Sequence, residues 1–231
     1  MLDRPTTADD LYLARGAEAR SFRPIMQGDV FEGIEIPGVE GDPSLAVVLT
    51  HPCSMRAGGG HLRPHLLMSR VALVDQIGLD AWPTGFYGVM PLPALTSTPD
   101  PSSHAATFEM QGRVASEHLA PSDRVACLSR EGILLLQQRL VYSLTRVLVP
   151  LHRLSEVCEP VLEEADLLEE WLEKFASDGE SSSVHREEAR FDALMGTVPS
   201  GTNSLRQRLV EPTTRADVRR SVRRAIAEGR T

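Results

Sequence analysis

The sequence predicts a small closed β-barrel followed by a helical extension, a fold class between mainly β and α+β. Three observations support this prediction. Short apolar runs alternate with Gly and Pro turn signals from Ile25 to about Val125. Beyond residue 130, leucines recur at helical spacing instead. The 231 residues, 42% of them hydrophobic, are enough for one domain of ordinary size with an appendage.

The strands are predicted from the apolar runs between these turn signals. Before them, the first 21 residues are polar, and we expect one helix from Asp9 to Arg20. Strands as short as those that follow, with Gly and Pro between them, favour a closed barrel over a doubly wound sheet. The predicted strands are Asp29 to Ile36, Leu45 to Leu49, His65 to Val74, Tyr87 to Pro91, Ala106 to Met110 and Arg124 to Leu128.

Four helices are predicted after the last strand. Ser129 is a suitable N-cap for a helix over Glu131 to Val147, and residues 155–160 open a second helix that runs to about Ala176. Two further helices are expected over Val184 to Met195 and Thr214 to Glu228. These elements divide the chain into an N-terminal polar segment (1–21), a barrel with its closing helix (22–150) and a helical extension (151–231).

Charge and composition restrict the classes of function. A net charge of −8 argues against a general nucleic-acid binder. No run of 18 uncharged apolar residues exists, and the N-terminus has no apolar signal core, so we expect no membrane partner. Cys53, Cys127 and Cys158 are widely spaced and form no CxxC motif, which is typical of a reducing cytosol. We therefore expect a cytoplasmic protein.

The greatest concentration of reactive side chains follows the apolar run Leu45 to Thr50. It is the hexapeptide His51-Pro-Cys-Ser-Met-Arg56, and beyond the glycines at 58–60 lie two more histidines, His61 and His65. Binding and catalytic groups often lie where a rigid strand opens into a loop. This segment is the first candidate for a site.

Four interpretations of this cluster remain open. Tetrahedral zinc could be bound by His51, Cys53, His61 and His65, which have suitable ligand types. Pro64 lies between the last two histidines and would disturb a helix that presents both rings together. Cys53 could instead be a nucleophile activated by His51 or His65. In RNA cleavage, His51 would act as the base and Arg56 as a phosphate clamp. The simplest interpretation, which we prefer, is a structural loop that needs no cofactor.

Arginines in two helices form the second candidate site. Arg139 and Arg146 are seven residues apart and share a helix face, where they can bind a phosphate, an acidic partner or, as we prefer, neighbouring carboxylates. In the last helix, arginines flank a narrow apolar stripe of Val218, Val222 and Ile226. This helix can dock on the acidic helix around Glu163, Glu164, Glu169 and Glu170, or bind RNA, DNA or a partner protein. The arginines proposed for binding are Arg63, Arg139, Arg146, Arg219, Arg220, Arg223 and Arg224.

The order of elements over about residues 22–150 resembles the PemK/MazF toxin family. The matching segments are Gly28-Asp29-Val30, Ala46 to Thr50, Val89-Met-Pro-Leu-Pro93 and Cys127-Leu-Ser-Arg-Glu131. The resemblance implies an SH3-like β-barrel with a face for RNA or protein. The family's ribonucleases have an arginine before the second of these segments and a threonine at the end of the third.

This chain has Pro43-Ser44 and Pro93 at those two positions, and none of these side chains can act in RNA cleavage. The resemblance therefore implies the fold without the catalytic pair. We expect a non-catalytic binding or adaptor protein with a protein partner, in a bacterial stress response or phage defence, and compatible with a homodimer. The alternatives are an endoribonuclease that uses His51, Arg56 and Arg63, and a zinc-binding protein.

Overall fold

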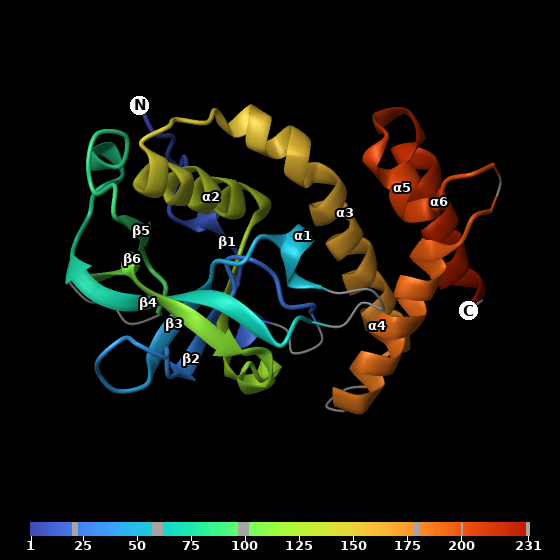
Figure 1. Cartoon of the computed structure of the whole chain (residues 1–231), viewed down its shortest axis with the longest axis horizontal. Coiled ribbons are helices and arrows are strands. Elements are labelled where there is room, and N and C mark those ends of the chain that lie inside the picture. Colours follow the sequence, from blue (N-terminus) through green and yellow to red (C-terminus); the bar gives the residue numbers. More distant parts are fainter. Residues whose placement is uncertain (20–22, 57–61, 97–101, 178–180, 200, 230–231) are drawn as a thin grey trace. The chain divides into compact units, whose positions relative to one another are not determined.

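The computed structural model describes residues 1–19, 23–56, 62–96, 102–177, 181–199 and 201–229 (Figure 1). The chain divides into two compact units. A sheet unit comprises residues 1–21, 25–51 and 64–157, and a helical unit comprises residues 22–24, 52–63 and 158–231. The fold class is α+β.

The sheet unit is built on one antiparallel sheet of seven strands. Their order is β1-β7-β2-β3-β4-β6-β5, and every adjacent pair is antiparallel. In the described residues the ladder does not join β1 to β5, so the strand pairing leaves the sheet open. The strands are β1 (Tyr12–Arg15), β2 (Val30–Ile34), β3 (Ser44–Val48), β4 (His65–Asp75), β5 (Val89–Leu92), β6 (Ser102–Ala115) and β7 (Arg124–Leu128).

The centre of the sheet is the apolar strand β3. Ala46, Val47 and Val48 are fully buried, which explains why this strand has a continuous apolar sequence and not an alternating one. Its neighbour β4 pairs with β6 from His65↔Ala115 to Asp75↔Ser102, with one register shift. The long β4–β6 ribbon therefore supports the strand that ends just before His51.

Side chains connect the two edges of the sheet. The hydroxyl of Tyr12, on β1, donates at 2.9 Å to the carbonyl oxygen of Pro93, the residue directly after β5. From the same strand, Nη1 of Arg15 donates to the carbonyl oxygen of Ala94 at 2.6 Å. The edge strands are thus held to each other without a backbone ladder.

Helix α2 (Arg130–Thr145) packs against β5, β7 and the short turn Asp9–Leu11. Ser129 is its N-cap, as predicted, because its Oγ accepts from the backbone N–H of Gly132. Gly132 is needed for this close packing, since a Cβ there would lie 2.3 Å from the backbone oxygen of Leu11. The predicted antiparallel structure with a covering helix is confirmed, but its predicted closure into a barrel is not, because no backbone ladder joins β1 to β5 in the described residues.

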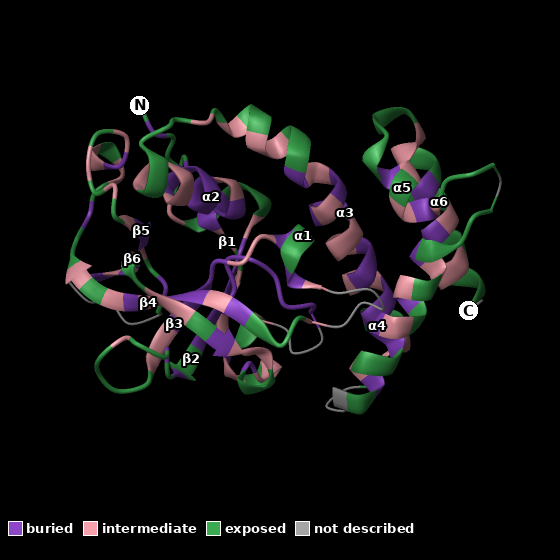
Figure 2. Cartoon of the chain, in the orientation of Figure 1, coloured by how far each residue is buried: buried purple, intermediate pink, exposed green. Residues whose placement is uncertain are grey.

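The helical unit has its own apolar core. Its elements are α1 (Pro52–Met55), the greater part of α3 (Leu151–Phe175), α4 (Ser181–Gly196), α5 (Leu205–Val210) and α6 (Pro212–Glu228). Trp171 is fully buried among residues from α3, α4, α5 and α6, with the ring of Phe175 at 4.7 Å and that of Phe191 at 5.9 Å. Each of these helices has a buried side and an exposed side (Figure 2).

The structure corrects three details of the sequence prediction. The predicted helix from Asp9 to Arg20 is wrong, because Tyr12–Arg15 pairs with β7 as a strand. The second long helix begins at Leu151, with Pro160 inside it, and α5 was not predicted. Strand β6 extends well beyond the predicted Ala106 to Met110, because it pairs with nearly the whole of β4. In the described residues no helix has the length and apolar character that crossing a membrane requires.

Candidate functional site

The predicted catalytic residues are divided between the two units. His51 lies beyond the end of β3 and is the last residue of the 25–51 stretch of the sheet unit, whereas Cys53 and Arg56 belong to the helical unit. His51 is half-buried, and this burial lowers the pKa of its imidazole, so the ring is neutral at pH 7. A neutral imidazole can accept a proton, which is the property that the nuclease interpretation requires of it.

Arg56 is engaged within the helical unit. Its Nη2 lies 3.7 Å from Oε1 of Glu188 on α4, and both side chains are largely buried. A phosphate would have to compete with this carboxylate for the guanidinium. Arg63, by contrast, is exposed, and its backbone N–H donates to the carbonyl oxygen of Met55 at 2.8 Å. The structure thus makes Arg63 the more accessible cation of this segment.

The predicted zinc ligands are placed only in part. His65 is exposed at the start of β4, and His61, like the glycines at 58–60, lies outside the described residues. Within the described ranges, no three His, Cys, Asp or Glu side chains are grouped so that they could hold a metal ion. The four-ligand set with His51 and Cys53 therefore stays a prediction.

The thiol of Cys53 is not activated. Desolvation raises the pKa of Cys53, and the negative charge of Glu164 raises it further, so the thiolate is disfavoured. We expect iodoacetamide at pH 7 to alkylate native Cys53 several-fold more slowly than the same cysteine in a peptide of residues 49–56. Mass spectrometry of the native protein gives the rate, and buried Cys127 and Cys158 serve as unreactive internal controls. Alkylation faster than in the peptide would restore the nucleophile interpretation.

Arg139 has a structural role that the sequence did not predict. Its side chain is fully buried in the sheet unit and donates to four backbone carbonyl oxygens in the connection before β5 and at its start. Burial lowers the pKa of Arg139 to about 10, so it is still a cation at neutral pH. The expectation that Arg139 binds a phosphate, a partner or a carboxylate is therefore wrong. The acceptors are Trp82 at 3.2 Å, Gly85 at 3.3 Å, Phe86 at 2.6 Å and Val89 at 2.8 Å.

Arg146, by contrast, is exposed and lies beside two tyrosines. Its guanidinium carbon is 6.0 Å from the ring centre of Tyr87 and 5.8 Å from that of Tyr142, and the two rings are 5.0 Å apart. Phe86, next to Tyr87, is 51% exposed. We call Phe86, Tyr87, Tyr142 and Arg146 the aromatic–arginine patch. In the described part of the chain Arg146 makes no ion pair, so its charge is available to a ligand.

The arginines of α6 are paired with α3, as the docking prediction required. Glu163 is almost fully buried. Its carboxylate forms ion pairs with Nη1 of Arg219 at 2.8 Å and with Nε of Arg215 at 3.6 Å. Arg223 forms two hydrogen bonds with Glu170, and these bonds raise the pKa of Arg223. The apolar stripe of α6 is buried at Val218 and Val222, which places the helix in the core. Intramolecular docking is confirmed.

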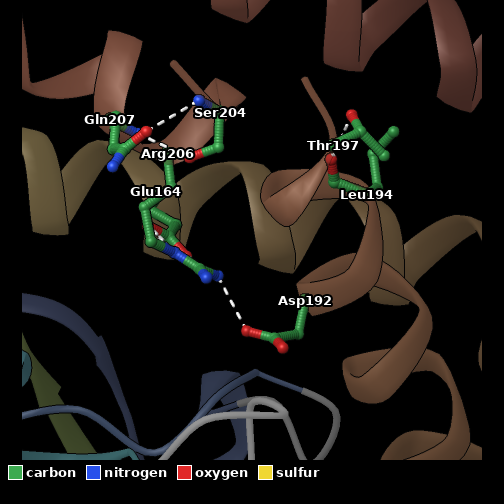
Figure 3. A network of polar contacts seen from close by, with 7 residues as sticks. All are labelled: Glu164, Asp192, Leu194, Thr197, Ser204, Arg206 and Gln207. Carbon is green, nitrogen blue, oxygen red and sulfur yellow. Dashed lines mark hydrogen bonds and ion pairs between the residues drawn. The ribbon is translucent and has the colours of Figure 1, made fainter. Parts of the chain in front are cut away.

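A second pairing attaches α5 to α3 and α4 (Figure 3). Nη2 of Arg206 lies 2.7 Å from Oε1 of Glu164 and 2.9 Å from Oδ1 of Asp192. Ser204 and Gln207 form a capping box that fixes the first turn of α5. At the other edge of the helical unit, Arg23 contacts Glu169 at 2.5 Å. All four predicted acidic residues of α3 are therefore engaged by arginines.

Two predicted binding arginines of α6 remain on the outside. Arg220 pairs only with Asp217 of its own helix, and Arg224 is exposed with no ion pair among the described residues. Two neighbouring cations are a small contact area for nucleic acid, whose affinity grows with the number of neutralised phosphates. The arginine-rich end is mainly a structural part of the helical unit.

The sequence did not predict the aromatic–arginine patch as a whole. Tyr142 and Arg146 are four residues apart on one helix, a spacing that indicates contact. Nothing in the sequence indicated that Phe86 and Tyr87 would join them. Known protein-family models and curated protein sequences yield no match to this chain.

Proposed function

We propose that this chain is a binding or adaptor protein built on an SH3-like barrel of the PemK/MazF type, and that it does not cleave RNA. The observation that carries the proposal is the internal use of its arginines. Arg56 faces Glu188, Arg139 binds backbone carbonyls, and the α6 arginines bind α3. Cations used in this way stabilise the protein and are not free to clamp a scissile phosphate.

Two features of the sheet unit support the barrel. An antiparallel sheet followed by a capped helix is the order of elements that the resemblance implies. Tyr12 and Arg15 also connect the β1 edge to the residues after β5, so side chains take the place of the missing ladder. By the same resemblance, we propose a role in a bacterial stress response or phage defence.

One observation favours the endoribonuclease alternative. His51 has a lowered pKa and is neutral at pH 7, as a general base should be. In this alternative, Arg63, which is exposed, would bind the phosphate in place of Arg56. The zinc-binding alternative depends on His61, and metal analysis of the purified protein tests it.

The proposal predicts that the purified chain leaves RNA intact. We expect mixed cellular RNA, incubated with the protein at pH 7 with and without EDTA, to keep its length distribution on a denaturing gel. The matched control is His51→Ala, which should behave in the same way. Cleavage that persists in EDTA and disappears in His51→Ala would replace the adaptor by a ribonuclease, and cleavage abolished by EDTA would indicate a metal-dependent enzyme.

A further inference from the structure

We infer that the aromatic–arginine patch is the docking surface of the sheet unit, and that it binds a segment of a partner protein with a carboxylate beside an apolar side chain. This inference rests on the proposed function, because it names the partner chemistry of a binding protein.

Hydrogen bonds fix the backbone that carries Phe86 and Tyr87. Phe86 has a positive φ of 55°, a conformation that a bulky side chain rarely adopts and that persists only where the surroundings impose it. Here Arg139 donates to the carbonyl oxygens of Gly85 and Phe86. The carbonyl oxygen of Phe86 also accepts from the backbone N–H of Val89. The connection before β5 therefore presents Phe86 to solvent from a fixed backbone beside the end of α2.

The residue types are those that dominate protein interfaces. Tyrosine, arginine and other aromatic side chains are enriched in binding hot spots, because they offer a large contact area at a small entropic cost. Tyr87 is anchored by its hydroxyl, which donates to the carbonyl oxygen of Thr84 at 2.7 Å. Val147 and Leu148 follow Arg146 and are 57% and 40% exposed. Exposed apolar residues thus follow the single cation directly along the chain.

The charge of the surroundings selects a protein partner over nucleic acid. The sheet unit contains more acidic than basic residues and carries nearly all of the net negative charge of the chain. A nucleic-acid strand carries one negative charge per nucleotide, and Arg146 alone cannot neutralise several phosphates on a negatively charged unit, whereas a peptide with a single carboxylate needs only one cation. A partner segment with one carboxylate that binds Arg146 and an adjoining apolar side chain that packs on Phe86 would match both features of the patch.

A charge-reversal selection tests the inference. A phage-displayed library of random peptides is panned against the full-length chain and, in parallel, against Arg146→Glu. We expect the wild type to enrich peptides in which Asp or Glu adjoins Phe, Leu or Trp. Synthetic copies should bind Arg146→Glu at least about tenfold more weakly, and a copy with Lys in place of the acid should regain binding to that variant.

The matched control is Arg113→Glu, an exposed arginine on β6 of the same unit, which should change the affinity less than twofold. Equal melting temperatures show that both variants fold. Failure to enrich acidic–apolar peptides, or binding that is unaffected by Arg146→Glu, overturns the inference. Binding of a single-stranded RNA that depends on Arg146 overturns it in favour of nucleic acid. RNA cleavage by the same preparation would contradict the proposed function, whereas the peptide-binding and RNA-binding results decide the role of the patch.

Discussion

A chain that lacks residues 212–231 is expected to lose the stable fold of its helical unit while the sheet unit remains folded. Deleting α6 exposes the core that Val218 and Val222 cover, which costs about 1.5 kcal/mol for each valine. It also leaves the buried carboxylate of Glu163 without Arg215 and Arg219, which costs about 2 kcal/mol because these arginines are partly exposed. The sum, about 5 kcal/mol, matches the whole stability of a small domain. Hydrogen exchange measured by mass spectrometry should show loss of protection in α3 and α4 but not in β3 and β4.

Two point variants separate the ion pairs from the apolar contacts. Glu163→Gln should lower the free energy of unfolding by about 2 kcal/mol, because two arginines lose a buried partner but are themselves partly exposed. Glu170→Gln, at an exposed pair with Arg223, should cost no more than about 0.5 kcal/mol. If the deletion instead spares the stability and abolishes a salt-sensitive RNA affinity, the α6 arginines serve nucleic acid and our assignment of α6 is wrong.

The sequence predicted most of the elements because each had a local cause. The continuous apolar run of β3 reflects burial on both faces, and Ser129 forms the cap that its residue type favours. The acidic face of α3 and the arginines of α6 were matched by charge alone, and the structure joins them. Local patterns of charge and polarity were therefore sufficient for these predictions.

The failures have tertiary causes. Residues 12–15 have no strong strand pattern, and they form β1 only because β7 offers a free edge and Pro93 and Ala94 accept their side-chain bonds. The sequence predicts Pro160 in the first turn of a helix, but α3 continues through it because packing on α4, α5 and α6 outweighs one lost hydrogen bond. The grouping of Phe86 and Tyr87 with α2 depends on contacts across more than fifty residues.

Arg139→Met is expected to destabilise the sheet unit by about 3–5 kcal/mol. The cost arises because the carbonyl oxygens of Trp82, Gly85 and Val89 lose the guanidinium as a donor, while that of Phe86 keeps the backbone N–H of Val89. A buried group without a partner costs about 1–3 kcal/mol. Chemical denaturation gives the change in the free energy of unfolding. Hydrogen exchange over residues 79–89 should rise first, since this connection depends on the guanidinium.

The control is Arg146, the residue that caps the C-terminus of the same helix. Arg146→Met should change the stability by no more than about 0.5 kcal/mol, because Arg146 is exposed and makes only ring contacts with Tyr87 and Tyr142. Arg139→Lys should recover only part of the loss, because an ammonium group has three donors and cannot span four carbonyl oxygens. Equal effects of Arg139→Met and Arg146→Met would mean that the carbonyls rehydrate freely, and Phe86 would then have no rigid support for the docking that we infer.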